Sequence, residues 1–115
     1  MDKRAIVHFE IPAINREAAG KFYHDAFGWN FTHVANYTTF ETGNVGGGFP
    51  DVDGKTYKPD DVIIYIASDD IDADLKAIEK LGGKKLSDKM DVPGYGVFAF
   101  FADPTGNRMA LFKGM

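Results

Sequence analysis

Two eight-residue segments of the chain share the frame T-G-N-x-x-x-x-F. They are Thr42–Phe49 and Thr105–Phe112, and they align without a gap. Each copy lies at the turn into the last expected strand of one half of the chain. Two unrelated tight turns would explain this identity, since Gly and Asn are common in turns. The order of elements on both sides matches, however, and this favours a duplicated module, which is a strong constraint on the fold.

The first half is expected to contain a strand, a helix and three further strands. Ala5–Ile11 alternates with the period of a strand. Asn15 is a suitable N-cap for a helix that runs to about Phe27 and ends at Gly28. The expected apolar stripe of this helix consists of Ala19, Phe22, Tyr23, Ala26 and Phe27. The three later strands are expected over residues 29–34, 37–42 and 45–49.

The same order follows in the second half. Val62–Ala67 is typical of a buried strand, and Asp70 is expected to cap a helix that ends at Gly82–Gly83. Further strands are expected over residues 84–86, 95–102 and 108–112. The sequence therefore predicts an α+β fold with two β-α-β-β-β modules in a single domain, residues 1–115. The modules cover about residues 1–50 and 61–115, and the polar residues 50–60 link them.

Composition excludes several classes of function. The chain has no cysteine, so disulfides, thiolate metal sites and cysteine nucleophiles are excluded. The formal net charge is −4 and no basic stripe is present, which argues against nucleic-acid partners. No apolar run is long enough for a membrane span or a signal peptide, so we expect no membrane partner and a cytoplasmic location.

The order of several short motifs resembles the vicinal oxygen chelate superfamily, which includes glyoxalases, bleomycin resistance proteins and ring-cleaving dioxygenases. The resemblance covers nearly the whole chain and is greatest to small bacterial glyoxalase-like members. It rests on segments 7–12 (V-H-F-E-I-P), 18–29, 46–48 (G-G-G), 69–73 (D-D-I-D-A), 82–83 and 101–107 (F-A-D-P-T-G-N). It implies paired βαβββ modules whose mixed sheet curls around a concave cavity, and it implies a homodimer.

Enzymes of this superfamily typically hold one divalent metal in the cavity. By the resemblance, the first ligand position falls on His8, and the other three fall near Gly47, near Ile63 and on Ala110. Glycine, isoleucine and alanine side chains cannot coordinate a metal, and one imidazole makes a weak site. We therefore predict no metal residue and no cofactor, with a divalent metal as the disfavoured alternative.

His8 and Glu10 are the candidate catalytic residues. Because side chains alternate along a strand, they should lie on the face opposite Val7, Phe9 and Ile11. The pair could perform acid–base chemistry. Alternatively, His8 is a structural histidine that is hydrogen-bonded to a neighbour, and Glu10 points to solvent or pairs with Arg108.

The candidate substrate-binding residues are Tyr65, Arg108, Phe98, Phe100 and Gly47. Arg108 should share a strand face with Ala110 and could bind a carboxylate, or form a salt bridge. Phe98 and Phe100 are either core residues or an aromatic surface on which a ligand stacks. Gly47 lies in a glycine run that would let a ligand approach the backbone, or would form a bulge or a weak edge strand.

The remaining polar residues have simpler interpretations. His24 and His33 have no partner at metal-ligand spacing and are expected on the surface. The aspartates at positions 69, 70, 72 and 74 lack the pattern of a calcium loop. They fit the N-terminus of a helix, through capping and the helix dipole.

Three functions remain open. The leading hypothesis is a protein that binds a small organic molecule in its cavity without a metal. The second is an enzyme of the lyase, isomerase or dioxygenase type, which uses His8 with an atypical metal site or His8 and Glu10 as an acid–base pair. The third is an accessory interaction module with a vestigial cavity. The fold cannot choose among them.

Overall fold

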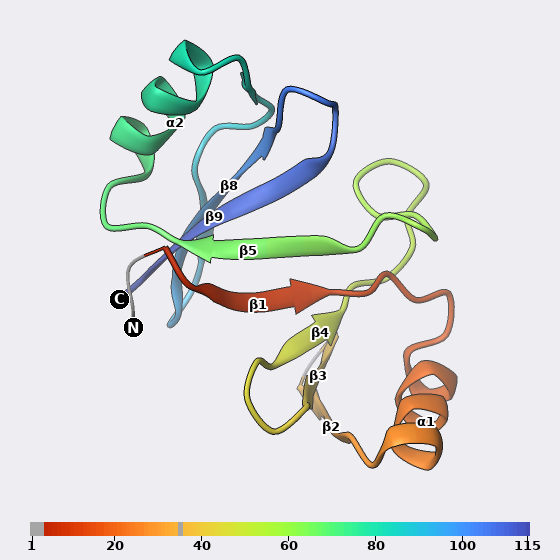
Figure 1. The fold of residues 1–115 in the computed structure, drawn as a ribbon. Helices are drawn as coiled ribbons and strands as arrows, with labels where there is room; N and C mark the ends of the chain where they lie inside the picture. Colours follow the sequence, from red (N-terminus) through yellow and green to blue (C-terminus); the bar gives the residue numbers. More distant parts are fainter. Residues whose placement is uncertain (1–3, 35) are drawn as a thin grey trace. The chain divides into compact units, whose positions relative to one another are not determined.

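A computed structural model describes residues 4–34 and 36–115 of the chain (Figure 1). These residues form two compact units, and each is described by itself. The N-terminal unit comprises residues 8–63, and the C-terminal unit comprises residues 4–7 and 64–115. No helix in these described ranges is long and apolar enough to cross a membrane.

The N-terminal unit contains a mixed sheet with strand order β2-β3-β4-β1. β1 spans Ile6–Glu10, and its first two residues belong to the other unit. β2, β3 and β4 span Asn30–Val34, Tyr37–Glu41 and Gly47–Phe49. β3 is antiparallel to β2 and to β4, whereas β4 is parallel to β1, with Phe9 opposite Gly47 and Glu10 opposite Gly48.

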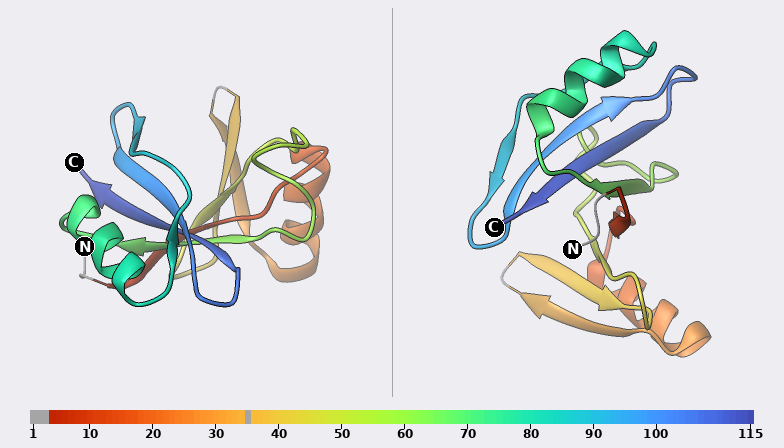
Figure 2. Two further views of the ribbon diagram at one scale, coloured as in Figure 1. Left: turned by 90° about the horizontal axis from the view of Figure 1, so that it is seen from above. Right: turned by 60° about the vertical axis from the view of Figure 1, so that its left-hand side comes forward.

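Helix α1, Arg16–Phe27, packs on one face of this sheet (Figure 2). The side chain of Asn15 accepts a hydrogen bond from the Ala18 N–H at 3.0 Å, which confirms the expected N-cap. Gly28 ends the helix with φ of 78°, a left-handed conformation that favours glycine. The bounds of the helix are therefore those that its capping residues predict.

The apolar stripe expected for α1 is only partly correct. Ala19 and Tyr23 pack against the core, which is built from Ala13, Phe40 and Phe49. Phe22 and Phe27, however, are 60% and 66% exposed. The sheet covers a narrow strip of the helix, and Phe22 lies beside that strip. The Phe27 ring contacts the edge of the cluster through Tyr23 and Trp29, at centroid distances of 6.2 and 6.0 Å.

Residues 50–62 contain no helix or strand, as expected of a linker. They nevertheless form part of the N-terminal unit. The Ala13 N–H donates to the Pro50 carbonyl at 2.9 Å, and the Val52 N–H donates to the Ala13 carbonyl at 3.1 Å. The segment is therefore tied by backbone hydrogen bonds to the chain just before α1.

The strands of the C-terminal unit lie in the order β5-β9-β8-β6, with β7 paired to β8. β5 spans Ile63–Ala67, β8 spans Gly96–Ala102 and β9 spans Arg108–Gly114. β5 is parallel to β9, and β8 is antiparallel to β9. Each of these three strands was predicted, with bounds that differ by one or two residues.

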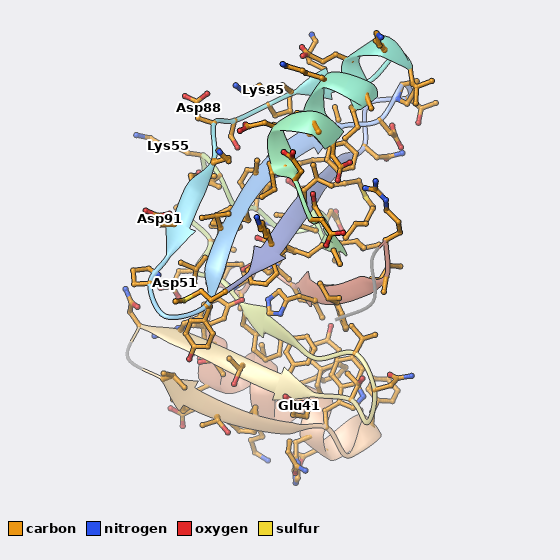
Figure 3. All side chains as sticks on the ribbon, turned by 90° about the vertical axis from the view of Figure 1, so that its left-hand side faces the viewer. Glu41, Asp51, Lys55, Lys85, Asp88 and Asp91 are labelled. Carbon is orange, nitrogen blue, oxygen red and sulfur yellow. The ribbon has the colours of Figure 1, made fainter. Side chains whose placement is uncertain are left out.

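Two short strands border β8. β6, Lys84–Lys85, was expected, and its Lys85 forms an ion pair with Asp88 at 2.9 Å (Figure 3). β7, Met90–Val92, was not expected. Three residues with a central aspartate are too few to show an alternating pattern. β7 forms because it pairs with the start of β8, Val92 opposite Gly96.

Helix α2, Ile71–Lys80, packs on one face of the C-terminal sheet. Asp70 caps it by accepting from the Ala73 N–H at 3.1 Å, and Asp72 forms an ion pair with Lys89. The capping interpretation is thus confirmed for Asp70, and Asp72 and Asp74 lie in the first turn of the helix. The buried residues of this face are Ile71, Leu75, Ala99, Phe101 and Leu111.

Each unit therefore has the β-α-β-β-β order, with β7 added in the second. The α+β class and the paired modules predicted from the sequence are confirmed.

Candidate functional site

His8 and Glu10 lie on the face of the N-terminal sheet that is turned away from α1. Their neighbours Phe9 and Ile11 pack in the helix-side core, so strand alternation places His8 and Glu10 on the opposite face. Glu10 is only 6% exposed. The interpretation in which Glu10 points to solvent is therefore wrong.

Tyr37 joins these two residues. Its hydroxyl donates a hydrogen bond to Oε2 of Glu10 at 2.8 Å, and the same oxygen lies 3.3 Å from Nε2 of His8. The three side chains thus form a chain of hydrogen bonds, which we call the His8–Tyr37–Glu10 chain. The sequence pattern predicted a strand at Tyr37 but no role for its side chain. Its signal was present in the alternation of β3, where Thr38 and Phe40 are buried and Tyr37 faces the other way.

Burial controls the ionisation of this chain. It lowers the pKa of His8 from 6.5 to about 4, so the imidazole is neutral at pH 7. Burial also raises the pKa of Tyr37, and the nearby charge of Glu10 and its hydrogen bond add to this effect. The phenol therefore keeps its proton at every physiological pH.

The glycine run makes room for Tyr37. A Cβ atom on Gly48 would overlap the hydroxyl and the ring of Tyr37, so no larger residue fits without moving that side chain. Gly47 points the other way, and its Cβ would meet the carbonyl of Phe9 and the ring of Phe40. β4 is also an interior strand of its unit, between β3 and β1, and not an edge strand.

The strand register in the structure differs by one residue from the alignment of the two sequence repeats. The alignment of the two T-G-N segments makes Gly47 equivalent to Ala110 of the other module. In the structure, Glu10 pairs with Gly48, just as Tyr65 pairs with Ala110 in the C-terminal sheet. Gly48 is therefore the structural counterpart of Ala110. Gly47 lies on the helix-side face, and its role in ligand binding remains a prediction.

The remaining predicted residues gather on the C-terminal sheet, on the face turned away from α2. Phe98 pairs with Phe112 and Phe100 with Ala110, so these side chains share one face. The Tyr65 and Phe98 rings lie 5.9 Å apart, and those of Phe98 and Phe100 lie 5.4 Å apart. Tyr65 and Phe100 are buried, whereas Phe98 keeps part of its surface exposed.

Arg108 belongs to the same face, as expected. Its guanidinium carbon lies 4.7 Å from the centre of the Phe100 ring. Such stacking orients the plane of the guanidinium. The structure therefore brings Tyr65, Phe98, Phe100 and Arg108 together within one unit.

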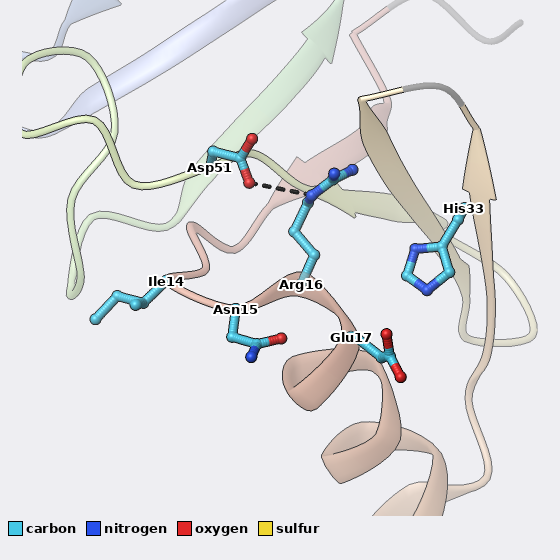
Figure 4. Close-up of a pocket in the computed structure, with 6 residues that line it drawn as sticks. All are labelled: Ile14, Asn15, Arg16, Glu17, His33 and Asp51. Atoms are coloured by element: carbon cyan, nitrogen blue, oxygen red, sulfur yellow. Dashed lines mark ion pairs between the residues drawn. The ribbon is translucent and has the colours of Figure 1, made fainter.

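A separate open pocket of about 470 Å³ lies at the start of α1 (Figure 4). Arg16 occupies it and forms an ion pair with Asp51, at 3.0 Å from Nε. His33 is exposed as expected, and its Nδ1 lies 2.6 Å from the hydroxyl oxygen of Thr38. The other residues that line the pocket are Ile14, Asn15 and Glu17. None of the predicted site residues lines it.

The fold and these faces define a glyoxalase-type α+β protein. Residues 5–111 match the family described as Glyoxalase/Bleomycin resistance protein/Dioxygenase superfamily. The chain therefore belongs to this superfamily, which confirms the resemblance.

Three relatives illustrate the range of this similarity. A glyoxylase-like domain-containing protein of Didymella fabae is 40% identical over 113 residues, which cover 89% of this chain and 88% of the relative. The anthracycline biosynthesis protein DnrV of Streptomyces peucetius is 32% identical over 91% of this chain. The match covers 45% of DnrV, so the chain spans about half of its length.

The third is a solved structure, that of a superfamily member from Vibrio splendidus 12B01. It has a TM-score of 0.70 at 9% identity, over 96% of this chain and 99% of that chain. At this identity, the likeness shows the fold alone.

The residues present do not fit the metal that the superfamily implies. Of the four ligand positions, only His8 carries a donor side chain, and Gly48, Ile63 and Ala110 carry none. Among the described residues, no three His, Asp or Glu side chains lie together in a group that could hold a metal ion. One imidazole is a weak site, since stable sites use three or four protein ligands.

Proposed function

We propose that this chain binds a planar aromatic molecule with an anionic group, without a metal. The observation that carries the proposal is the guanidinium of Arg108, stacked 4.7 Å above the Phe100 ring. The Phe100 ring in turn contacts the partly exposed Phe98 on the same face. The name of the relative DnrV, an anthracycline biosynthesis protein, supports the same ligand class, because anthracyclines are planar polycyclic aromatics.

The aromatic part of such a ligand would contact Phe98. Offset or edge-to-face packing of aromatic rings contributes about 0.5–1.5 kcal/mol beyond the buried area. Tyr65 and Phe100 contact the Phe98 ring on the same face and limit its motion. A ring held in one orientation loses little conformational entropy when a ligand binds, which favours affinity.

The anionic part would contact Arg108. The planar guanidinium can donate two parallel hydrogen bonds to a carboxylate, and such charged pairs are about twice as strong as neutral ones. Its position over Phe100 keeps the side chain ordered before binding. A lysine at this position would offer neither the stacking nor the paired geometry.

A calorimetric titration of metal-stripped protein with anthraquinone-2-carboxylate tests the proposal. We expect saturable 1:1 binding, which Arg108→Met weakens about tenfold, the effect of losing a hydrogen bond to a charged group. Arg108→Met should weaken the binding of the neutral anthraquinone-2-carboxamide much less. Lys113→Met, which removes an exposed charge from the same strand, is the matched control and should bind like the wild type.

Two results would overturn the proposal. One is the absence of saturable binding, which would favour the accessory module with a vestigial cavity. The other is binding that requires added Ni²⁺, Zn²⁺ or Mn²⁺, which would favour the metalloenzyme. A cytoplasmic location and a homodimer remain predictions from the sequence and the resemblance, and gel filtration tests the second.

The His8–Tyr37–Glu10 chain favours a second candidate function, a metal-free acid–base enzyme. Its hydrogen bonds join a neutral imidazole to a buried carboxylate, a combination that can move a proton at neutral pH. An aryl ketone in D₂O is a suitable probe, because its α-hydrogens exchange slowly unaided. Exchange that the wild type accelerates and His8→Ala does not would support this function, and equal rates would exclude it for this probe.

A further inference from the structure

We propose that Tyr37 is a positioning residue, which holds the proton of His8 on Nε2 and so converts the superfamily's metal-ligand position into a hydrogen-bonding one. This inference rests on the proposed metal-free function. It concerns the direction of the hydrogen bonds in the His8–Tyr37–Glu10 chain.

The direction follows from counting protons. A tyrosine hydroxyl has one proton to donate and an oxygen that accepts. Tyr37 donates its proton to Oε2 of Glu10 at 2.8 Å. Toward His8, 3.3 Å away, the same oxygen can therefore only accept. The hydrogen bond then requires that Nε2 of His8 carries the ring proton, which leaves Nδ1 as the basic nitrogen.

The burial of Glu10 makes this direction stable. A carboxylate that is 6% exposed needs donors, because a buried charge without hydrogen bonds costs several kcal/mol. If the Tyr37 proton turned toward His8, the carboxylate would lose that donor. The phenol cannot respond by losing its proton, since burial raises the pKa of Tyr37.

Gly48 determines where the Tyr37 hydroxyl lies. Thr39 pairs with Gly48 across β3 and β4, and Gly48 pairs with Glu10 across β4 and β1. Tyr37, two residues before Thr39, points to the same face. Because residue 48 has no side chain, the Tyr37 ring crosses β4 at that residue and its hydroxyl reaches Glu10.

The consequence for metal binding is direct. A histidine nitrogen must be deprotonated to bind a metal, so metal and proton compete for it. A metal at Nε2 would displace a proton that Tyr37 holds, and would break the hydrogen bond between them. The Tyr37 hydroxyl therefore disfavours a metal at Nε2, and the lack of donor side chains at the other three ligand positions disfavours a metal independently.

Long-range ¹⁵N–¹H NMR of the imidazole tests the proposal on the whole chain without any ligand. In the wild type we expect one nitrogen of His8 in the protonated range, assigned to Nε2, and Nδ1 in the unprotonated range, with no change from pH 8 to pH 6. A protonated Nδ1 in the wild type would overturn the proposal, and this result needs no variant.

The variant Tyr37→Phe removes only the hydroxyl. We expect the ¹⁵N shifts of its His8 to move away from the wild-type values, whereas Tyr95→Phe, at an exposed tyrosine, should leave the spectrum unchanged. A Tyr37→Phe spectrum identical to that of the wild type would show that another group sets the tautomer, and would overturn the proposal. Circular dichroism establishes that both variants are folded.

The two proposals can fail separately. If anthraquinone-2-carboxylate does not bind but His8 is protonated at Nε2 and responds to Tyr37→Phe, only the proposed function is wrong. If the ligand binds and the tautomer is Nδ1–H, only the role of Tyr37 is wrong.

Discussion

Gly48 lies against Tyr37 so closely that a Cβ atom at residue 48 would overlap the tyrosine hydroxyl. The glycine run that suggested ligand access to the backbone, a bulge or a weak edge strand thus accommodates a side chain from the neighbouring strand. The glycine and the tyrosine depend on each other, and both influence His8 and Glu10.

Substitution of Gly48 by alanine should therefore destabilise the fold. Overpacking of this kind costs about 1–3 kcal/mol, because Tyr37 must leave its position or β4 must shift. Urea unfolding measures the loss. Gly46→Ala is the matched control, since its Cβ would lie 3.1 Å or more from its neighbours and needs only a small adjustment. Equal losses in the two variants would contradict this account of Gly48.

The aromatic core of the N-terminal unit should dominate its stability. Phe49 is fully buried and packs against Phe40, with ring centroids 4.8 Å apart. Phe49→Ala should lower the free energy of unfolding by about 3–5 kcal/mol, through lost transfer energy and a cavity. Phe22→Ala, at an exposed position of α1, should change it by less than about 0.5 kcal/mol. A comparable loss at Phe22 would mean that this face of α1 is covered in solution.

Acid should destabilise the protein partly through His8. Burial lowers the pKa of this imidazole from 6.5 to about 4. Between these two values the unfolded chain binds a proton that the folded chain does not, so stability is full above pH 6.5 and falls as the pH drops toward 4. The full difference is about 3 kcal/mol.

Urea unfolding of the wild type and of His8→Gln from pH 8 to pH 4 isolates this contribution. The variant should lose part of the pH dependence that the wild type shows. A wild-type slope that His8→Gln leaves unaltered would mean that His8 is protonated as easily in the folded protein as in the unfolded chain.

The N-cap of α2 should by itself make a measurable contribution to the free energy of unfolding. Asp70 accepts the Ala73 N–H at 3.1 Å, so Asp70→Ala leaves that donor to water and should cost about 1 kcal/mol. Asp70→Asn keeps the acceptor and should cost far less. Thermal unfolding of the two variants provides the comparison, and equal losses would assign the effect to the charge of Asp70 instead of its hydrogen bond.

The sequence predicted the local elements well because their signals are local. Asn15 and Asp70 each bond a backbone N–H three residues away, and the apolar run Val62–Ala67 is continuous in the sequence. These features would exist with any partner strands. By contrast, β7 was missed because its three residues have no pattern of their own and depend on the pairing with β8.

Which helix residues are buried was predicted less well. Phe22 and Phe27 belong to the apolar residues of α1, but whether an apolar side chain is covered depends on the width of the sheet beneath it. The sequence repeat likewise did not predict the register of the paired strands. The shared T-G-N frame identified equivalent turns, yet strand register set Gly48, and not Gly47, opposite Glu10.

The sequence by itself determined the α+β class, the module order, the helix caps and the poor set of metal donors, because these depend on residue type and on neighbours a few positions apart. Only the tertiary structure decided that Tyr37 joins His8 to Glu10. That contact spans 27 residues between Glu10 and Tyr37, and it requires two strands to be aligned through a third, in a register that a shift of one residue would reverse.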